Sequence, residues 1–159
     1  MSEERFLGIY LNDHLAGAIA GSELAKRAAK NNEGTPLGAL LDRLSTDIDE
    51  DRRALETMMS DLGVRRDVVK DAAAWMAEKV GRLKLNGRLV GYSDLSRLVE
   101  LEGLSLGVEG KLAMWRNLSR IGEKYPAVAG ANIEQLIQRA EAQRRELEEA
   151  RQEAAIRAL

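Results

Sequence analysis

The sequence lacks cysteine and contains only one histidine, two prolines and 4% aromatic residues. Without cysteine, disulfides, zinc–thiolate sites and cysteine nucleophiles are excluded. The low aromatic content leaves too few rings for a surface that stacks nucleic-acid bases. Because proline is so scarce among 159 residues, and Ala, Leu, Glu and Arg are abundant, helix is favoured along the whole chain.

Neither sign of charge dominates, and no long apolar run is present. The 24 basic and 26 acidic residues give a net charge of −2, whereas a nucleic-acid-binding protein normally shows a basic excess or stripe. The small-residue run from Ala16 to Ser22 is too short and too weakly apolar for a membrane span. The first five residues include two acids where a secretory signal has a basic start. We therefore expect a cytoplasmic protein without a nucleic-acid or membrane partner.

Apolar residues recur at spacings of three and four from end to end, and this pattern predicts helices. Turn chemistry separates the helices from one another. Thr35 can cap a helix with Pro36 in its first turn, Gly63 suits the position after a helix, and Tyr125-Pro126 breaks the chain again. We expect long helices over about 6–31, 36–62, 94–123 and 132–159, with a shorter helix over about 67–85.

The connections between the long helices differ in length. The first and last are short, which makes the helices that they join antiparallel neighbours, while roughly thirty residues separate Gly63 from Tyr92. Such a long connection carries the chain across a bundle, whereas an up-down-up-down bundle would not need it. The sequence therefore predicts one all-α domain over residues 1–159, a four-helix bundle with an additional shorter helix in its long crossover. An irregular helical domain is the alternative.

The four long helices carry two patterns, each of which occurs twice and in alternating order. The first and third helices share Leu15-x-Gly17-x-x-x-Gly21-x-Glu23 and Leu101-x-Gly103-x-x-x-Gly107-x-Glu109. The second and fourth share Asp49-x-x-Arg52-Arg53-x-Leu55-Glu56 and Glu141-x-x-Arg144-Arg145-x-Leu147-Glu148. We interpret the two matches together as an internal repeat of a helix pair.

The repeated glycines need a reason, because glycine costs about 1 kcal/mol relative to alanine inside a helix. Gly17 and Gly21 lie four residues apart on one helix face, as do Gly103 and Gly107. A face without side chains allows close approach of another helix or leaves room for a bulky residue opposite. We favour this packing groove, and a ligand pocket against the bare backbone is the alternative.

In its repeat order and connectivity the chain resembles the ferritin-like superfamily, which includes rubrerythrins and carboxylate-bridged di-iron proteins. The resemblance covers nearly the whole chain. In the metal-binding members, the first and third helices each supply a Glu, and the second and fourth each supply Glu-x-x-His. By this resemblance, Glu23 and Glu109 match the lone glutamates, and Asp49 and Glu141 match the acids of the paired motif.

The histidine positions of the paired motif fall on Arg52 and Arg144. Arginine stays protonated in proteins and has no lone pair for a metal, and two guanidinium groups would repel the dication. The single histidine, His14, cannot replace two ligands. The resemblance thus implies a degenerate member without the di-iron site. Its matching acids and arginines form either an inward acid–base lattice or surface ion pairs, and we favour the surface pairs.

Two other features have ordinary structural explanations. Helical spacing, and the absence of a calcium-loop pattern, predict a solvated helix face for the acidic cluster of Asp47, Asp49, Glu50 and Asp51. Trp75 and Trp115, each beside a methionine, are expected in the core, with a hydrophobic pocket as the alternative.

The residues form no catalytic constellation that we would assign, and we expect no cofactor. The predicted function is non-enzymatic: a structural or protein-interaction module. We expect it to associate with itself, as a homodimer or larger species, or with a protein partner, through one glycine-bearing or alanine-rich face. The alternative is a di-metal carboxylate protein with atypical ligands, either an oxidase or an iron-handling protein. A third hypothesis is a small-molecule carrier with its pocket opposite the glycines.

Overall fold

The computed structural model describes residues 2–67 and 91–159, and within these ranges it contains helices and no strands. The all-α prediction is therefore confirmed for the described part of the chain. The helix predicted over 67–85 falls, apart from its first residue, outside the described residues. The described helices are α1 (Glu3–Asn31), α2 (Pro36–Asp61), α4 (Asp94–Ile121), α5 (Pro126–Ala129) and α6 (Ile133–Ala158).

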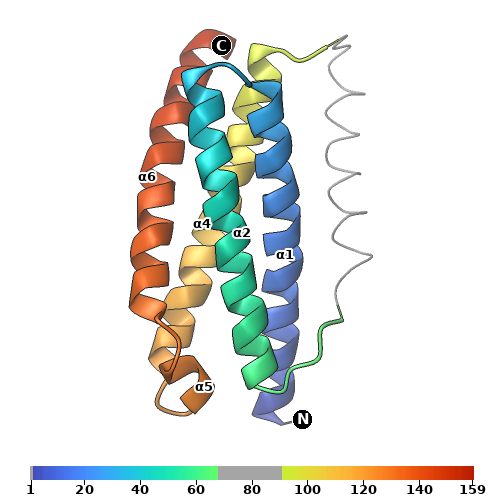
Figure 1. Cartoon of the computed structure of the whole chain (residues 1–159), viewed down its shortest axis with the longest axis vertical. Helices are drawn as coiled ribbons and strands as arrows, with labels where there is room; N and C mark the ends of the chain where they lie inside the picture. Colours follow the sequence, from blue (N-terminus) through green and yellow to red (C-terminus); the bar gives the residue numbers. More distant parts are fainter. Residues whose placement is uncertain (1, 68–90) are drawn as a thin grey trace.

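The four long helices pack lengthwise against one another (Figure 1). α1 and α2 form one antiparallel pair, α4 and α6 form another, and α1 also packs along α4. α2 ends at the end of the bundle that holds the N-terminus, whereas α4 begins at the opposite end, near the C-terminus (Figure 1). α2 and α4 consequently run in the same direction, as the long connection between them predicts.

The helix ends follow the local chemistry that the sequence indicates. The Thr35 side chain accepts a hydrogen bond from the Gly38 N–H at 3.0 Å and caps α2. Ser93 caps α4 in a capping box with Ser96. Gly63 follows α2 with φ 68°, a left-handed conformation that glycine adopts without strain. α1 begins three residues before its predicted start, and the four-residue α5, which starts at Pro126, was not predicted.

The core divides into two apolar clusters, one toward each end of the bundle. The cluster at the N-terminal end of α1 is built around Trp115, which is fully buried. The cluster at the other end is built around Leu41, Leu44 and Leu101. Trp115 therefore lies in the core, as predicted, while Trp75 lies outside the described residues. No helix in the described ranges is long and apolar enough to cross a bilayer.

Asn32 links three helices at the end of the bundle where α1 turns into α2. It is 3% exposed, and its Nδ2 donates to the Ala28 carbonyl at 2.8 Å and to the Tyr92 hydroxyl at 2.9 Å. Its Oδ1 accepts from Arg97 Nε at 2.7 Å. Asn32 is thus a buried junction between the α1–α2 turn and the start of α4.

The Tyr92 hydroxyl at this junction donates to Glu100 Oε2 at 2.9 Å. Burial, together with the neighbouring Glu100 carboxylate, raises the pKa of Tyr92 from 10.0 to about 12. A folded-state pKa above the unfolded one stabilises the native state below pH 10, and this contribution is lost as the pH rises toward 12. We therefore expect the wild type to lose more stability than Tyr92→Phe over that interval. The tyrosinate absorbance of the wild type minus that of Tyr92→Phe should show a step near pH 12; a step near pH 10 would contradict the assignment.

Candidate functional site

A cluster of three buried polar side chains separates the two apolar halves of the core. Asp51 of α2 and Gln143 of α6 are 2% and 1% exposed, and the Lys111 side chain of α4 reaches between them. Lys111 Nζ lies 2.6 Å from Asp51 Oδ2 and also donates to Gln143 Oε1. Gln143 Nε2 donates to Asp51 Oδ2 at 3.2 Å. The three side chains thus join α2, α4 and α6 near the middle of the bundle.

The charges of this cluster are close to balanced. Burial lowers the pKa of Lys111 below its ordinary value, although the attraction of Asp51 opposes the shift. Arg139 Nη1 lies 3.4 Å from Asp51 Oδ1 and 2.8 Å from Glu50 Oε2, so a second cation faces the same carboxylate from the rim. A buried ion pair of this kind adds little net stability but strongly penalises the loss of one partner.

The cluster could have been found from the sequence, and we did not identify it there. Asp51 lies three residues after Ile48 and four before Leu55, on the buried stripe of α2. Gln143 occupies the same kind of position between Ala140 and Leu147 on α6. A polar residue in register with an apolar stripe was the available signal. The prediction of a solvated face for the acidic cluster is therefore wrong for Asp51.

A cavity of about 180 Å³ adjoins the polar cluster between α1, α2 and α4. Its walls are mostly apolar, with Ile48 and Leu55 from α2 and Leu104, Val108 and Met114 from α4. Four glycines leave the helix backbones bare around it. Asp51, Lys111 and Trp115 also line the cavity, and the remaining lining residues are Asp13, His14, Gly17, Ala18, Gly21, Arg52, Gly107 and Gly110.

The glycines do not serve the close helix packing that we favoured from the sequence. A Cβ built on Gly17, Gly21, Gly107 or Gly110 would meet no atom of the described residues within 4 Å. Gly103 differs, because a Cβ there would lie 3.0 Å from Leu24 Cδ2. Within the described part of one chain, close packing therefore accounts for Gly103 and not for Gly17, Gly21 or Gly107, of which Gly17 and Gly107 are exposed.

Two polar atoms of residues that line the cavity lack hydrogen bonds within the described part of the chain. They are Trp115 Nε1, a donor, and Asp51 Oδ1, an acceptor that lies 3.4 Å from Arg139 Nη1. His14 also lines the cavity and packs edge-on against the Tyr10 ring, with centroids 4.6 Å apart. Burial lowers the pKa of His14, which favours its neutral form.

The residues that match ferritin-like ligands on the first helix pair lie toward the surface. The Glu23 side chain is 70% exposed and pairs with Lys26 at 3.7 Å. Asp49 accepts from Ser22 Oγ at 3.0 Å and pairs with Arg52, whose Nη2 lies 3.1 Å away. Burial alone would raise the pKa of Asp49. The Ser22 hydrogen bond and the positive charges of Arg52 and Lys26 outweigh burial and lower this pKa below its ordinary value.

The matching residues on the second helix pair are also divided among surface contacts. Arg144 Nη1 lies 3.3 Å from Glu109 Oε1, and both side chains are largely exposed. Glu141 pairs instead with Arg116 at 2.8 Å. The six matching residues thus form separate ion pairs rather than one lattice, with the Asp49–Arg52 pair half-buried, and they do not fit a carboxylate-bridged metal pair. In residues 2–67 and 91–159, no three acidic or histidine side chains are grouped as metal ligands.

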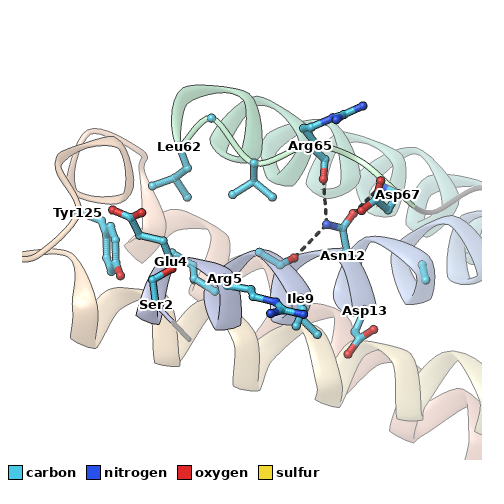
Figure 2. A pocket seen from close by; sticks show the side chains of 15 residues that line it. Ser2, Glu4, Arg5, Ile9, Asn12, Asp13, Leu62, Arg65, Asp67 and Tyr125 are labelled. Carbon is cyan, nitrogen blue, oxygen red and sulfur yellow. Dashed lines mark hydrogen bonds between the residues drawn. The ribbon is translucent and has the colours of Figure 1, made fainter.

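A larger hollow of about 930 Å³ lies between the first turns of α1 and residues 62–67 (Figure 2). Asn12 spans it, with Nδ2 donating to the Arg65 carbonyl at 2.9 Å and Oδ1 accepting from the Asp67 N–H at 3.0 Å. Glu4 and Arg5 are exposed at its rim. Because its polar groups are exposed or already hydrogen-bonded, this hollow has less of the chemistry of a binding site than the smaller cavity.

Comparison with models of known protein families, with curated proteins and with solved structures gave no match for this chain.

Proposed function

We propose that this chain is a ferritin-like helical bundle without a di-iron site, and that it serves as a structural or protein-interaction module. The directions of the helices support the proposal: α2 and α4 run in the same direction, while α1 with α2 and α4 with α6 form antiparallel pairs (Figure 1). Its main support is the buried cluster of Asp51, Lys111 and Gln143 in the middle of the bundle. An ammonium group at the centre of such a bundle repels a dication, and Lys111 already occupies one oxygen of Asp51.

The outer face of α4 offers a surface for self-association. Leu106 is 74% exposed there, and Gly103 and Ala113, also exposed, lie on the same face three and seven residues away. Small residues around one projecting leucine allow a second helix to approach closely, and burial of the leucine favours the contact. We propose that two copies of the chain pack through this glycine-bearing face of α4.

Leu106→Arg tests the self-association. A charge in the middle of a helix–helix contact is expected to weaken the dimer by about tenfold or more, because the guanidinium must be desolvated without a partner. Sedimentation equilibrium of the full chain gives the dissociation constant. Ile156→Arg, at an aliphatic residue 83% exposed on α6, is the matched control and should leave the constant unchanged. A monomeric wild type, or equal weakening by both variants, would contradict the proposal.

Elemental analysis of protein purified without chelator separates the proposed function from the di-metal alternative. We expect transition metals well below one equivalent per chain. One or two equivalents of iron or manganese would overturn the proposal and indicate ligands other than the six matching residues. Added Mn²⁺ should also leave the unfolding midpoint unchanged, since a metal that binds only the native state would raise it.

A further inference from the structure

The outer face of α4 carries a seam at the spacing of a two-helix coiled coil. Five residues follow one another at intervals of three and four, and so lie in one line along the helix: Gly103, Leu106, Gly110, Ala113 and Asn117. Leu106, 74% exposed, is the only large apolar residue among them. Gly103, Ala113 and Asn117 are exposed as well, and a Cβ on Gly110 would meet no atom of the described residues within 4 Å. A second helix can therefore reach this seam and bury one leucine against small residues.

The order of large and small residues along the seam favours an antiparallel contact between two copies. In a parallel pair each residue meets its own equivalent, so Leu106 would face Leu106 and the two Gly110 backbones would leave a gap. In an antiparallel pair with its two-fold axis midway between residues 106 and 110, Leu106 of each copy faces Gly110 of the other, and Ala113 faces Gly103. Both leucines then fill the space beside a bare backbone, which buries more apolar surface without a void.

One edge of the seam carries charges that complement each other in the same orientation. Glu102, Glu109 and Arg116 lie seven residues apart, and their side chains are 50%, 52% and 52% exposed. Each is paired with a residue of α6, but pairs on so exposed a surface contribute little and leave the charges available to a second copy. The antiparallel axis places Glu102 of each copy near Arg116 of the other, while the two Glu109 carboxylates meet at the axis, each beside an arginine of its own α6. A parallel pair would set these side chains beside Gly107 and Met114, which carry no charge.

We infer, on the basis of the self-association proposed above, that two copies of the chain pack α4 against α4 in antiparallel orientation. The two-fold axis passes between Leu106 and Gly110, and Glu102 pairs with Arg116 of the second copy at both ends of the contact. The partner that fits this face is thus a second copy turned end over end. A two-fold contact of this kind is closed, so it produces a dimer and no larger species.

Single cysteines report the orientation directly, because the chain contains none of its own. In an antiparallel pair the two thiols of Glu109→Cys meet at the axis, and a short thiol–thiol cross-linker should join them. Glu102→Cys lies on the same edge, but its two copies would be about 18 Å apart along the helix, beyond the reach of such a link. Non-reducing electrophoresis of the full chain, at a concentration where the wild type is dimeric, should show a covalent dimer for Glu109→Cys and little for Glu102→Cys.

Reversal of the edge charges provides a second test. Glu102→Arg and Arg116→Glu should each weaken the dimer about three- to tenfold in sedimentation equilibrium, because each turns two attractive contacts into repulsive ones. The double variant restores opposite charges across the axis and should recover most of the lost affinity, although its pairs with α6 stay mismatched. Equal cross-linking of the two cysteine variants, or no recovery in the double variant, would overturn the antiparallel packing and leave the self-association standing. A monomeric wild type would overturn both.

Discussion

Asp51→Ala is expected to lower the free energy of unfolding by about 3–5 kcal/mol, the largest effect that we predict for a single substitution. The reason is the charge that the substitution leaves behind. Asp51 Oδ2 lies 2.6 Å from Lys111 Nζ, and the Lys111 side chain is only 13% exposed. Without the carboxylate, Lys111 retains only the neutral Gln143 as a partner within the cluster, whereas Arg139 remains paired with Glu50. Urea unfolding of the wild type and the variant, followed by circular dichroism, measures the difference.

Two further variants show whether the loss comes from the buried charge. Glu109→Ala removes an acid from an exposed cross-helix pair with Arg144, and it should cost about 0–1 kcal/mol. A triple replacement of Asp51, Lys111 and Gln143 by Leu, Met and Leu removes the whole polar cluster. We expect its stability to be within about 1 kcal/mol of the wild type or higher. A triple variant as unstable as Asp51→Ala would attribute the loss to packing instead.

The helix boundaries could be predicted from the sequence because they depend on local chemistry. Thr35 caps α2 through a hydrogen bond to the N–H three residues later, and Gly63 takes up the left-handed conformation after it. The long connection after α2 also predicts correctly that α2 and α4 start from the same end of the bundle (Figure 1). Each of these predictions uses neighbours in the chain, so no knowledge of packing is required.

The repeat pattern selected the wrong residues for the candidate site, because matching spacings do not fix which face of a helix is buried. Two residues along a helix rotate the side chain by about 200°. Asp49, which the repeat pattern selects, therefore lies on the partly exposed side of α2, whereas Asp51 lies in the core. Gln143 has the same relation to Glu141 on α6. A shift of two residues separates the surface ion pairs from the buried cluster.

The buried cluster and the cavity belong to one layer of the bundle, because Asp51 and Lys111 contribute to both. Apolar side chains on either side would otherwise pack with several registers of similar energy. A polar group that must meet its partner penalises such shifts, which is the best-attested role of a buried ion pair.

Gly38→Ala is expected to give the second large loss, about 2–3 kcal/mol, through a clash with backbone rather than with a side chain. A Cβ at Gly38 would lie 2.1 Å from the Asn32 carbonyl oxygen and 2.7 Å from its carbon. Asn32 cannot move away freely, since its side chain is held by Tyr92 and Arg97. The better helix propensity of alanine offsets about 1 kcal/mol of the strain at most.

Gly21→Ala provides the matched control, because the same substitution in α1 would place its Cβ in open space. There the gain in helix propensity is expected to raise the free energy of unfolding by about 0.5–1 kcal/mol. Urea unfolding of both variants compares two identical chemical changes that differ only in what the methyl group meets. If Gly38→Ala were as stable as Gly21→Ala, the close approach at Gly38 would not explain why glycine is present there. The turn between α1 and α2 would then adjust its conformation without breaking the hydrogen bonds of Asn32.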